Sequence, residues 1–125
     1  VLQSVFTHMF DEEIKHYLEE FERVLRPGGV VWASVFIVDE AIRKHISELA
    51  PTQYALSFRH PLGNGCYINN TDSKRGAVAF TRDRLDELVE GSGLVHARDP
   101  LRGGWSEYYD QPEFGQDCLI LKNVN

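Results

Sequence analysis

The fold is decided by residues 11–38, which read DEEIKHYLEEFERVLRPGGVVWASVFIV. Over residues 11–25 the apolar side chains recur every three or four positions and charged side chains fill the positions between them, which predicts a helix with one face on a core. Asp11 is positioned to cap its start. Pro27 cannot continue this helix, and the two glycines after it tolerate a positive φ, so we expect a turn there. Residues 30–38 form an apolar run without alternation, which predicts one strand buried on both faces of a parallel sheet.

The region after this strand is less regular. Asp39 can cap a short helix that ends at Pro51. Residues 52–79 are irregular and aromatic, and the glycines of Gly63-Asn64-Gly65 favour a loop or a loose hairpin. A connection of this length is typical of a lid or a binding loop, although a crossover that shields the sheet without binding a ligand fits the same pattern.

The last part of the chain predicts one more helix and two strands. Thr81 can cap a helix over residues 81–90, with Phe80 and Leu85 at the spacing of a hydrophobic staple. Residues 94–101 and 118–122 then have the composition of strands, and because no helix separates them we expect them to be antiparallel. The whole pattern predicts an α/β fold with a mixed sheet, in which the strand over residues 30–38 is central and lies beside the last strand.

The composition excludes several classes of function. Thirteen Lys and Arg against nineteen Asp and Glu give a formal charge of -6, which disfavours binding to nucleic acid. Cys66 and Cys118 are too few for a disulfide scaffold, and no His, Cys or acidic residues recur at the spacing of metal ligands. The longest apolar run is far shorter than the ~20 residues of a membrane helix. We therefore expect a cytoplasmic protein, with residues 1–125 in a single domain and neither a metal, a nucleic acid nor a membrane as partner.

Several of these segments resemble the second half of the class I S-adenosylmethionine-dependent methyltransferases. Residues 4–9, the first helix, the turn Arg23-Val24-Leu25-Arg26-Pro27-Gly28-Gly29 and the next strand follow one another as the segment after strand four, helix D, an R-x-L-x-P-G-G turn and strand five do in that family. The family also ends in an antiparallel hairpin, with the seventh strand beside the fifth. The resemblance covers nearly the whole chain and implies a partial Rossmann-like methyltransferase fold, in which residues 39–79 are an insertion that forms a lid or substrate region.

The resemblance also implies a chemistry, the transfer of a methyl group from S-adenosylmethionine to a small-molecule or sugar acceptor. Ligands in open α/β sheets bind at the carboxyl ends of the strands, so the loop after the first strand is expected to contact the cofactor through Ser4, Val5, Phe6 and Thr7. The aromatic side chains expected to form the acceptor pocket, close to His8, are Phe58, Tyr67, Trp105 and Tyr109. His8 and His60 are the histidines best placed to act as a catalytic base.

These residues also have interpretations without a ligand. His8 can simply be hydrated at the entry of the first helix. Trp105 and Tyr109 can plug the open end of the final hairpin instead of lining a substrate entrance.

The cofactor fingerprint of the family, a strand followed by a glycine-rich turn into a helix, is not found in these 125 residues. We therefore expect the chain to be the C-terminal half of a longer enzyme that on its own binds S-adenosylmethionine weakly or not at all. Apolar surfaces left uncovered would then favour a homo-oligomer. The alternative function is a non-catalytic, methyltransferase-like module for binding or assembly.

Overall fold

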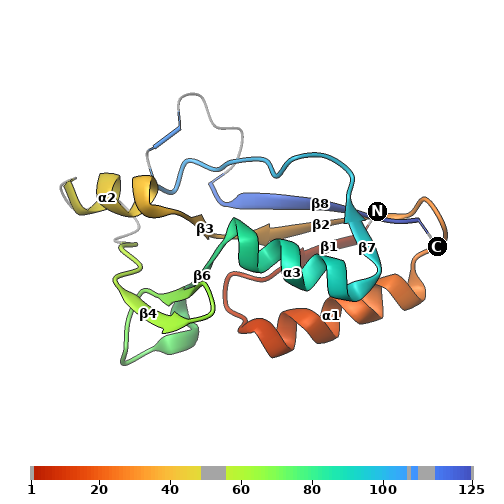
Figure 1. Cartoon of the computed structure of the whole chain (residues 1–125), viewed down its shortest axis with the longest axis horizontal. Coiled ribbons are helices and arrows are strands. Elements are labelled where there is room, and N and C mark those ends of the chain that lie inside the picture. Colours follow the sequence, from red (N-terminus) through yellow and green to blue (C-terminus); the bar gives the residue numbers. More distant parts are fainter. Residues whose placement is uncertain (1, 49–55, 107, 110–114, 125) are drawn as a thin grey trace.

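A computed structural model describes residues 2–48, 56–106, 108–109 and 115–124, which form an α/β fold with two four-stranded sheets (Figure 1). The elements are β1 (Leu2–Val5), α1 (Asp11–Val24), β2 (Val30–Val35), β3 (Ile37–Val38), α2 (Glu40–Glu48), β4 (His60–Gly63), β5 (Cys66–Ile68), β6 (Val78–Thr81), α3 (Arg82–Ser92), β7 (Leu94–His96) and β8 (Asp117–Asn123), with a 3₁₀ turn at Lys74–Gly76.

The first sheet has the strand order β1-β2-β8-β7. β1 and β2 are parallel, whereas β8 is antiparallel to both β2 and β7. Helices α1 and α3 lie side by side on one face of this sheet (Figure 1). The predictions of a mixed sheet, of an antiparallel final pair of strands and of a last strand beside residues 30–35 are confirmed.

The main core lies between this sheet and the two helices. Helix α1 contributes Ile14 and Leu18, and α3 contributes Leu85, Leu88 and Val89. They pack with the side chains of β2 and β8 that point toward the helices, which are Val31, Ala33, Val35, Leu119 and Leu121. Because full burial of one such aliphatic side chain stabilises a fold by about 1.5–3 kcal/mol, this layer is the main source of stability of the first sheet.

The entry of α1 differs from the prediction. Phe10, and not Asp11, is the N-cap residue, and its backbone N–H donates to Glu13 Oε1 over 3.2 Å. Asp11 instead accepts from Arg84 Nη2 of α3 at 2.9 Å. Asp11 therefore links the two helices.

The expected single strand over residues 30–38 is divided in the structure. β2 ends at Val35, and after Phe36 the chain continues as β3, which pairs with β6 in the second sheet. The prediction of burial on both faces is also wrong for β2, because Val30, Trp32 and Ser34 are only partly buried while the residues between them are fully buried. The reason is that both packed helices lie on one face of the sheet (Figure 1).

The second sheet has the order β3-β6-β5-β4. β4 and β5 form a hairpin whose turn residues Gly63, Asn64 and Gly65 all have positive φ, which confirms the expected hairpin about these glycines. Asp39 Oδ1 accepts from the backbone N–H of Ile42 at 2.7 Å, as expected for the cap of α2. The Pro51 expected to end that helix is outside the described residues.

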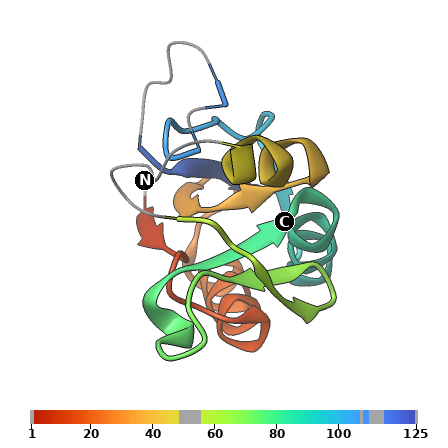
Figure 2. The same cartoon turned by 90° about the vertical axis from the view of Figure 1, so that its left-hand side faces the viewer.

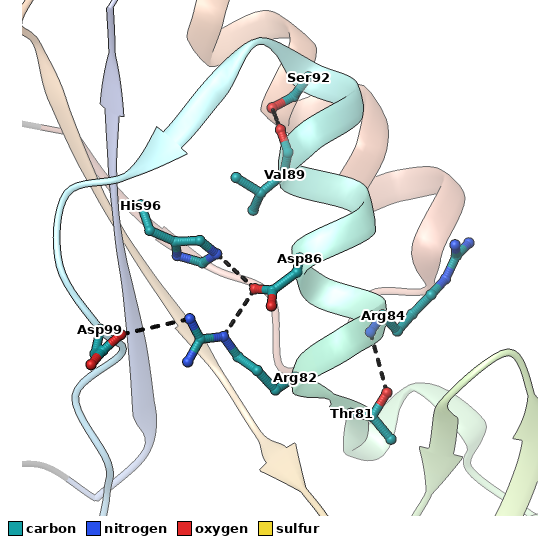
Figure 3. Close-up of polar contacts among 8 residues, drawn as sticks. All are labelled: Thr81, Arg82, Arg84, Asp86, Val89, Ser92, His96 and Asp99. Carbon is teal, nitrogen blue, oxygen red and sulfur yellow. Dashed lines mark hydrogen bonds and ion pairs between the residues drawn. The ribbon is translucent and has the colours of Figure 1, made fainter.

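Helix α3 is fixed at both ends and to the strand that follows it (Figure 3). Thr81 Oγ1 accepts from the backbone N–H of Arg84 at 3.3 Å, as predicted, and Gly93 ends the helix with φ 86°. Asp86 Oδ1 lies 2.9 Å from both His96 Nε2 and Arg82 Nε, which connects the helix to β7. The predicted strand over residues 94–101 is shorter than expected and ends at His96. Beyond it, the backbone N–H of Ala97 donates to the carbonyl of Ile120 at 2.8 Å, and Leu101 forms an isolated bridge to Cys118.

Asp117, the first residue of β8, joins three parts of the chain. Its fully buried carboxylate accepts from the backbone N–H of Ile37 and from Trp105 Nε1 on Oδ2, at 2.7 and 2.9 Å. Oδ1 accepts from the backbone N–H of Gly103 at 2.7 Å and from Arg102 Nε at 3.2 Å. Arg102 Nη2 also donates to the carbonyl of Ile37 at 3.0 Å. The start of β3, where the chain passes from one sheet to the other, is therefore held at both its N–H and its carbonyl.

A substitution at Gly103 tests how closely its segment approaches the backbone before Asp117. A Cβ atom on Gly103 would lie 2.4 Å from the carbonyl carbon of Gln116, so Gly103→Ala must push the backbone away from Asp117. We expect it to lower the free energy of unfolding in urea by about 1–3 kcal/mol.

Gly91→Ala is the matched control, because Gly91 lies in α3 and a Cβ there meets nothing within 4 Å. It should raise the free energy of unfolding by about 0.5–1 kcal/mol through helix propensity. Equal stability of the Gly103 variant and the parent protein would contradict the described packing.

Candidate functional site

A pocket of about 740 Å³ opens on the first sheet. The described residues that line it come from β1, β2, β8 and three connections, and they are Gln3, Ser4, Val5, Trp32, Ser34, Phe36, Leu56, Trp105, Gly115, Gln116 and Cys118. A volume of this size, with mostly apolar walls and a few polar groups, is typical of small-molecule sites.

The alternation of side chains along the strands explains the position of the pocket. Gln3 pairs with Trp32, and Val5 and Cys118 both pair with Ser34, so these five side chains point to the same face of the sheet. The residues that alternate with them along β2 and β8, such as Ala33 and Leu119, point to the opposite face, where α1 and α3 cover them. Ser4 of the edge strand β1 pairs with Ala33, and it lines the pocket although its strand position belongs to the helix face. The pocket therefore lies on the face of the sheet opposite to the two packed helices.

One wall of the pocket is aromatic and well fixed. The rings of Phe36, Phe58 and Trp105 contact one another with centroids 5.2–5.3 Å apart. The hydrogen bond from Trp105 Nε1 to the buried carboxylate of Asp117 sets the orientation of the indole. Trp105 and Phe36 thus present a rigid apolar surface to a ligand, with Phe58 packed against them.

Every residue of the described ranges that lines this pocket is uncharged. The side chains of Gln3, Gln116 and Ser34 can exchange hydrogen bonds with a ligand. Cys118 is 8% exposed as a residue, and burial raises the pKa of its thiol, so it behaves as an apolar contact at neutral pH. Within the described ranges no cluster of His, Cys, Asp or Glu could hold a metal ion. The arrangement suits binding and orientation of a flat or apolar molecule.

The structure divides the four residues expected to contact a cofactor. Ser4 and Val5 line the pocket, and Val5 is half exposed. Phe6 is buried in the core beneath the helices, and Thr7 is fully buried with its backbone carbonyl accepting from Val78 N–H at 2.8 Å. Phe6 and Thr7 therefore do not line the pocket.

Of the residues expected to bind an acceptor, only Trp105 lines the pocket. Phe58 is fully buried next to Trp105. Tyr67 and Tyr109 pack at the edge of the same cluster, and each carries a guanidinium over its ring, from Arg43 at 4.4 Å and from Arg102 at 4.7 Å.

The two histidines proposed as bases are not brought together. Thr7, next to His8, is bonded to Val78 of β6, whereas His60 lies in β4, at the far edge of the second sheet. The backbone at Thr7 and the backbone at His60 are therefore three strand spacings apart, across β6 and β5, which is roughly 14 Å. His8 Nδ1 lies 2.9 Å from the carbonyl of Arg75, both histidines are exposed, and neither lines the pocket. The expected convergence around His8 is therefore not found, and a catalytic role of either histidine stays a prediction.

Most residues of the pocket are not among those predicted from the sequence. Gln3, Trp32, Ser34, Phe36, Gln116 and Cys118 were not among the predicted site residues, although all of them line it. Trp32 and Ser34 occupy alternate positions of a strand that was interpreted as buried on both faces. A bulky aromatic side chain and a hydroxyl at alternate positions were the signal that this face was only partly covered.

No protein-family model matches this chain, and no solved structure matches it significantly. None of the helices in the described ranges combines the length and the apolarity needed to cross a membrane.

The reactivity of the Cys66 and Cys118 thiols tests whether these side chains are buried as described. Burial, with a smaller effect of the nearby Asp11 carboxylate, raises the pKa of Cys66 to about 11, and burial also raises the pKa of Cys118. Because the thiolate is the reacting form, Cys66 in the folded protein at pH 8 should react with a disulfide reagent about a hundredfold more slowly than in urea, and Cys118 should also be slow.

Cys66→Ala and Cys118→Ala assign the reaction to each thiol. Rapid modification of either cysteine without denaturant would show that its side chain is accessible, contrary to the structure.

Proposed function

We propose that this chain is the C-terminal part of an S-adenosylmethionine-dependent methyltransferase that acts on a small-molecule or sugar acceptor. The observation that carries the proposal is the strand order β1-β2-β8-β7. β1 and β2 are parallel, and the last strand of the chain, β8, is antiparallel and lies between β2 and β7. In the family that the sequence resembles, strands four, five, seven and six have this order. The turn that joins α1 to β2 carries the glycines of the resembling motif, and Gly28 has φ 84° as such a turn requires.

The pocket supports the proposal through its chemistry. It borders the carboxyl ends of β1 and β2, the edge at which open α/β sheets bind ligands. Its aromatic rings, from Trp32, Phe36 and Trp105, suit both a planar base and a sulfonium cation. Its hydroxyl and amide groups are neutral and can fix the orientation of either.

When bound, S-adenosylmethionine supplies an activated methyl group. The residues of this chain would contribute by positioning: Ser4 and Val5 at the end of β1 would contact the cofactor, and Trp105 would bound the acceptor. Holding two reactants in line at near-attack distance accounts for much of the catalysis of a bimolecular transfer, so the chain need not supply a nucleophile.

The proposal is tested by titrating S-adenosylmethionine into the protein encoded by the complete reading frame and, separately, into residues 1–125. We expect saturable binding by the complete protein and weak or no binding by residues 1–125, which lack the glycine-rich turn. Trp32→Ala in the complete protein should weaken binding at least about tenfold, the size of one lost aromatic contact in a partly buried site.

Val95→Ala is the control, because Val95 is an exposed aliphatic residue of β7 outside the pocket. It should leave the affinity unchanged. A complete protein that neither binds S-adenosylmethionine nor transfers its methyl group would refute the proposal and favour the non-catalytic binding module.

A further inference from the structure

A second cleft, of about 480 Å³, lies between α2 and the segment that leads into β4. Glu40, Arg43, Lys44 and Ser47 line it from one face of the helix, and Ser57 and Arg59 line it from the opposite segment. In Figure 2 both segments face the viewer, with α2 above the yellow-green chain that leads into β4. Leu56, which precedes this lining, faces the first pocket instead, so the two sites are separate.

The cleft is basic although the chain as a whole is acidic. Arg43, Lys44 and Arg59 supply three positive charges and Glu40 one negative charge, a formal charge of +2 in a chain of net charge -6. Within the described ranges, none of these three cations forms an ion pair with an acidic side chain, whereas other arginines, such as Arg75, Arg82 and Arg84, do. The charges of the cleft are therefore available to a ligand.

Arg43 is held in a fixed position. Its guanidinium lies 4.4 Å from the centre of the Tyr67 ring, and its backbone N–H donates to Asp39 at the start of α2. Its Nε atom is buried and has no hydrogen-bond partner in the described part of the chain. A buried donor without a partner is costly, because the desolvation of such a group is worth about 1–3 kcal/mol. Nε is closed off from solvent in this position, so a ligand acceptor reaches it only if the side chain shifts, and that contact would then remove the cost.

The opposite wall is also ordered by side-chain contacts. The backbone N–H of Ser57 donates to Asn69 Oδ1 at 2.7 Å, which ties this segment to the second sheet. Phe58, the next residue, is fully buried and has φ 47°, an unusual conformation that places its neighbours Ser57 and Arg59 in the cleft lining. The hydroxyl of Ser57 and the guanidinium of Arg59 thus line the cleft opposite α2, on a backbone that is held in place.

We propose that this cleft binds the phosphate group of a small phosphate monoester. A phosphate monoester carries about -1.5 to -2 charges near neutral pH and three acceptor oxygens, which matches the formal charge of the cleft and its guanidinium, ammonium and hydroxyl donors. A carboxylate offers one negative charge and only two oxygens. The net charge of the chain and the small size of the cleft disfavour a polyanion such as a nucleic acid. This site is independent of whether the first pocket binds S-adenosylmethionine.

Backbone amide NMR of the 125-residue protein, titrated with inorganic phosphate, glycerol 3-phosphate or acetate, tests the proposal. We expect saturable shifts confined to residues 40–47 and 57–59, with tighter binding of the monoester than of free phosphate and the weakest response to acetate. Arg43→Gln should weaken phosphate binding by about tenfold or more, as expected for loss of a charge-assisted hydrogen bond. Arg59→Gln removes an exposed cation of the same cleft and should weaken binding as well, which keeps the test valid if the Arg43 variant folds poorly.

Arg26→Gln is the matched control, because Arg26 is exposed in the turn after α1, at the opposite end of the molecule from α2 (Figure 1). It should leave the affinity unchanged. The proposal is overturned if phosphate shifts the amide signals of residues far from the cleft as strongly as those of residues 40–47 and 57–59. It is also overturned if Arg26→Gln weakens binding as much as Arg59→Gln, or if acetate binds as tightly as the monoester. Equal affinity for free phosphate and for the monoester would show that the cleft recognises the free ion.

Discussion

The rest of the structure depends on the carboxylate of Asp117. This group is fully buried and accepts four hydrogen bonds, two from backbone N–H groups and two from the side chains of Arg102 and Trp105. A buried carboxylate is stable only when its acceptor sites are filled, so the four donors must come together at one point. They come from the start of β3 and from the connection between β7 and β8. One side chain thereby fixes the place where the chain leaves the first sheet and enters the second.

This constraint also shapes the pocket on the first sheet. Trp105 lines the pocket and is oriented by Asp117, and Phe36, which packs against Trp105, is the residue between β2 and β3. The neighbouring residues Gln116 and Cys118 line the same pocket from β8 and the turn before it. A ligand in the pocket would therefore contact side chains whose positions are fixed by the junction of the two sheets, which is the kind of rigid support that precise orientation of reactants requires.

Much of the fold could be predicted from local patterns, because the signals were short-range. The period of α1, the cap at Thr81 and the hairpin at Asn64 each depend on residues close in sequence. The division of the strand after Val35 could not be predicted, since apolar side chains suit either sheet and the choice depends on long-range bonds, such as those from Ile37 to Asp117 and from Phe80 to Phe36. Asp11 was assigned to a cap because acidic residues favour helix starts, but its partner Arg84 is 73 positions away. For the same reason sequence could identify Ser4, Val5 and Trp105 in the site but not Trp32, Ser34 or Cys118, whose exposure depends on which face of the sheet the helices cover.

Replacing Asp117 by Asn tests the central role of this carboxylate most directly. The substitution keeps the shape of the side chain but turns one acceptor oxygen into a donor, so that two of the four donors face an NH₂ group. The free energy of unfolding should fall by about 3 kcal/mol or more, and the fluorescence of Trp105, followed in a Trp32→Phe background, should change with it. Asp99→Asn is the control, because the Asp99 side chain is 96% exposed and faces Arg82 at 3.8 Å, so its loss should cost less than about 0.5 kcal/mol. An Asp117→Asn protein as stable as the Asp99 variant would contradict the account.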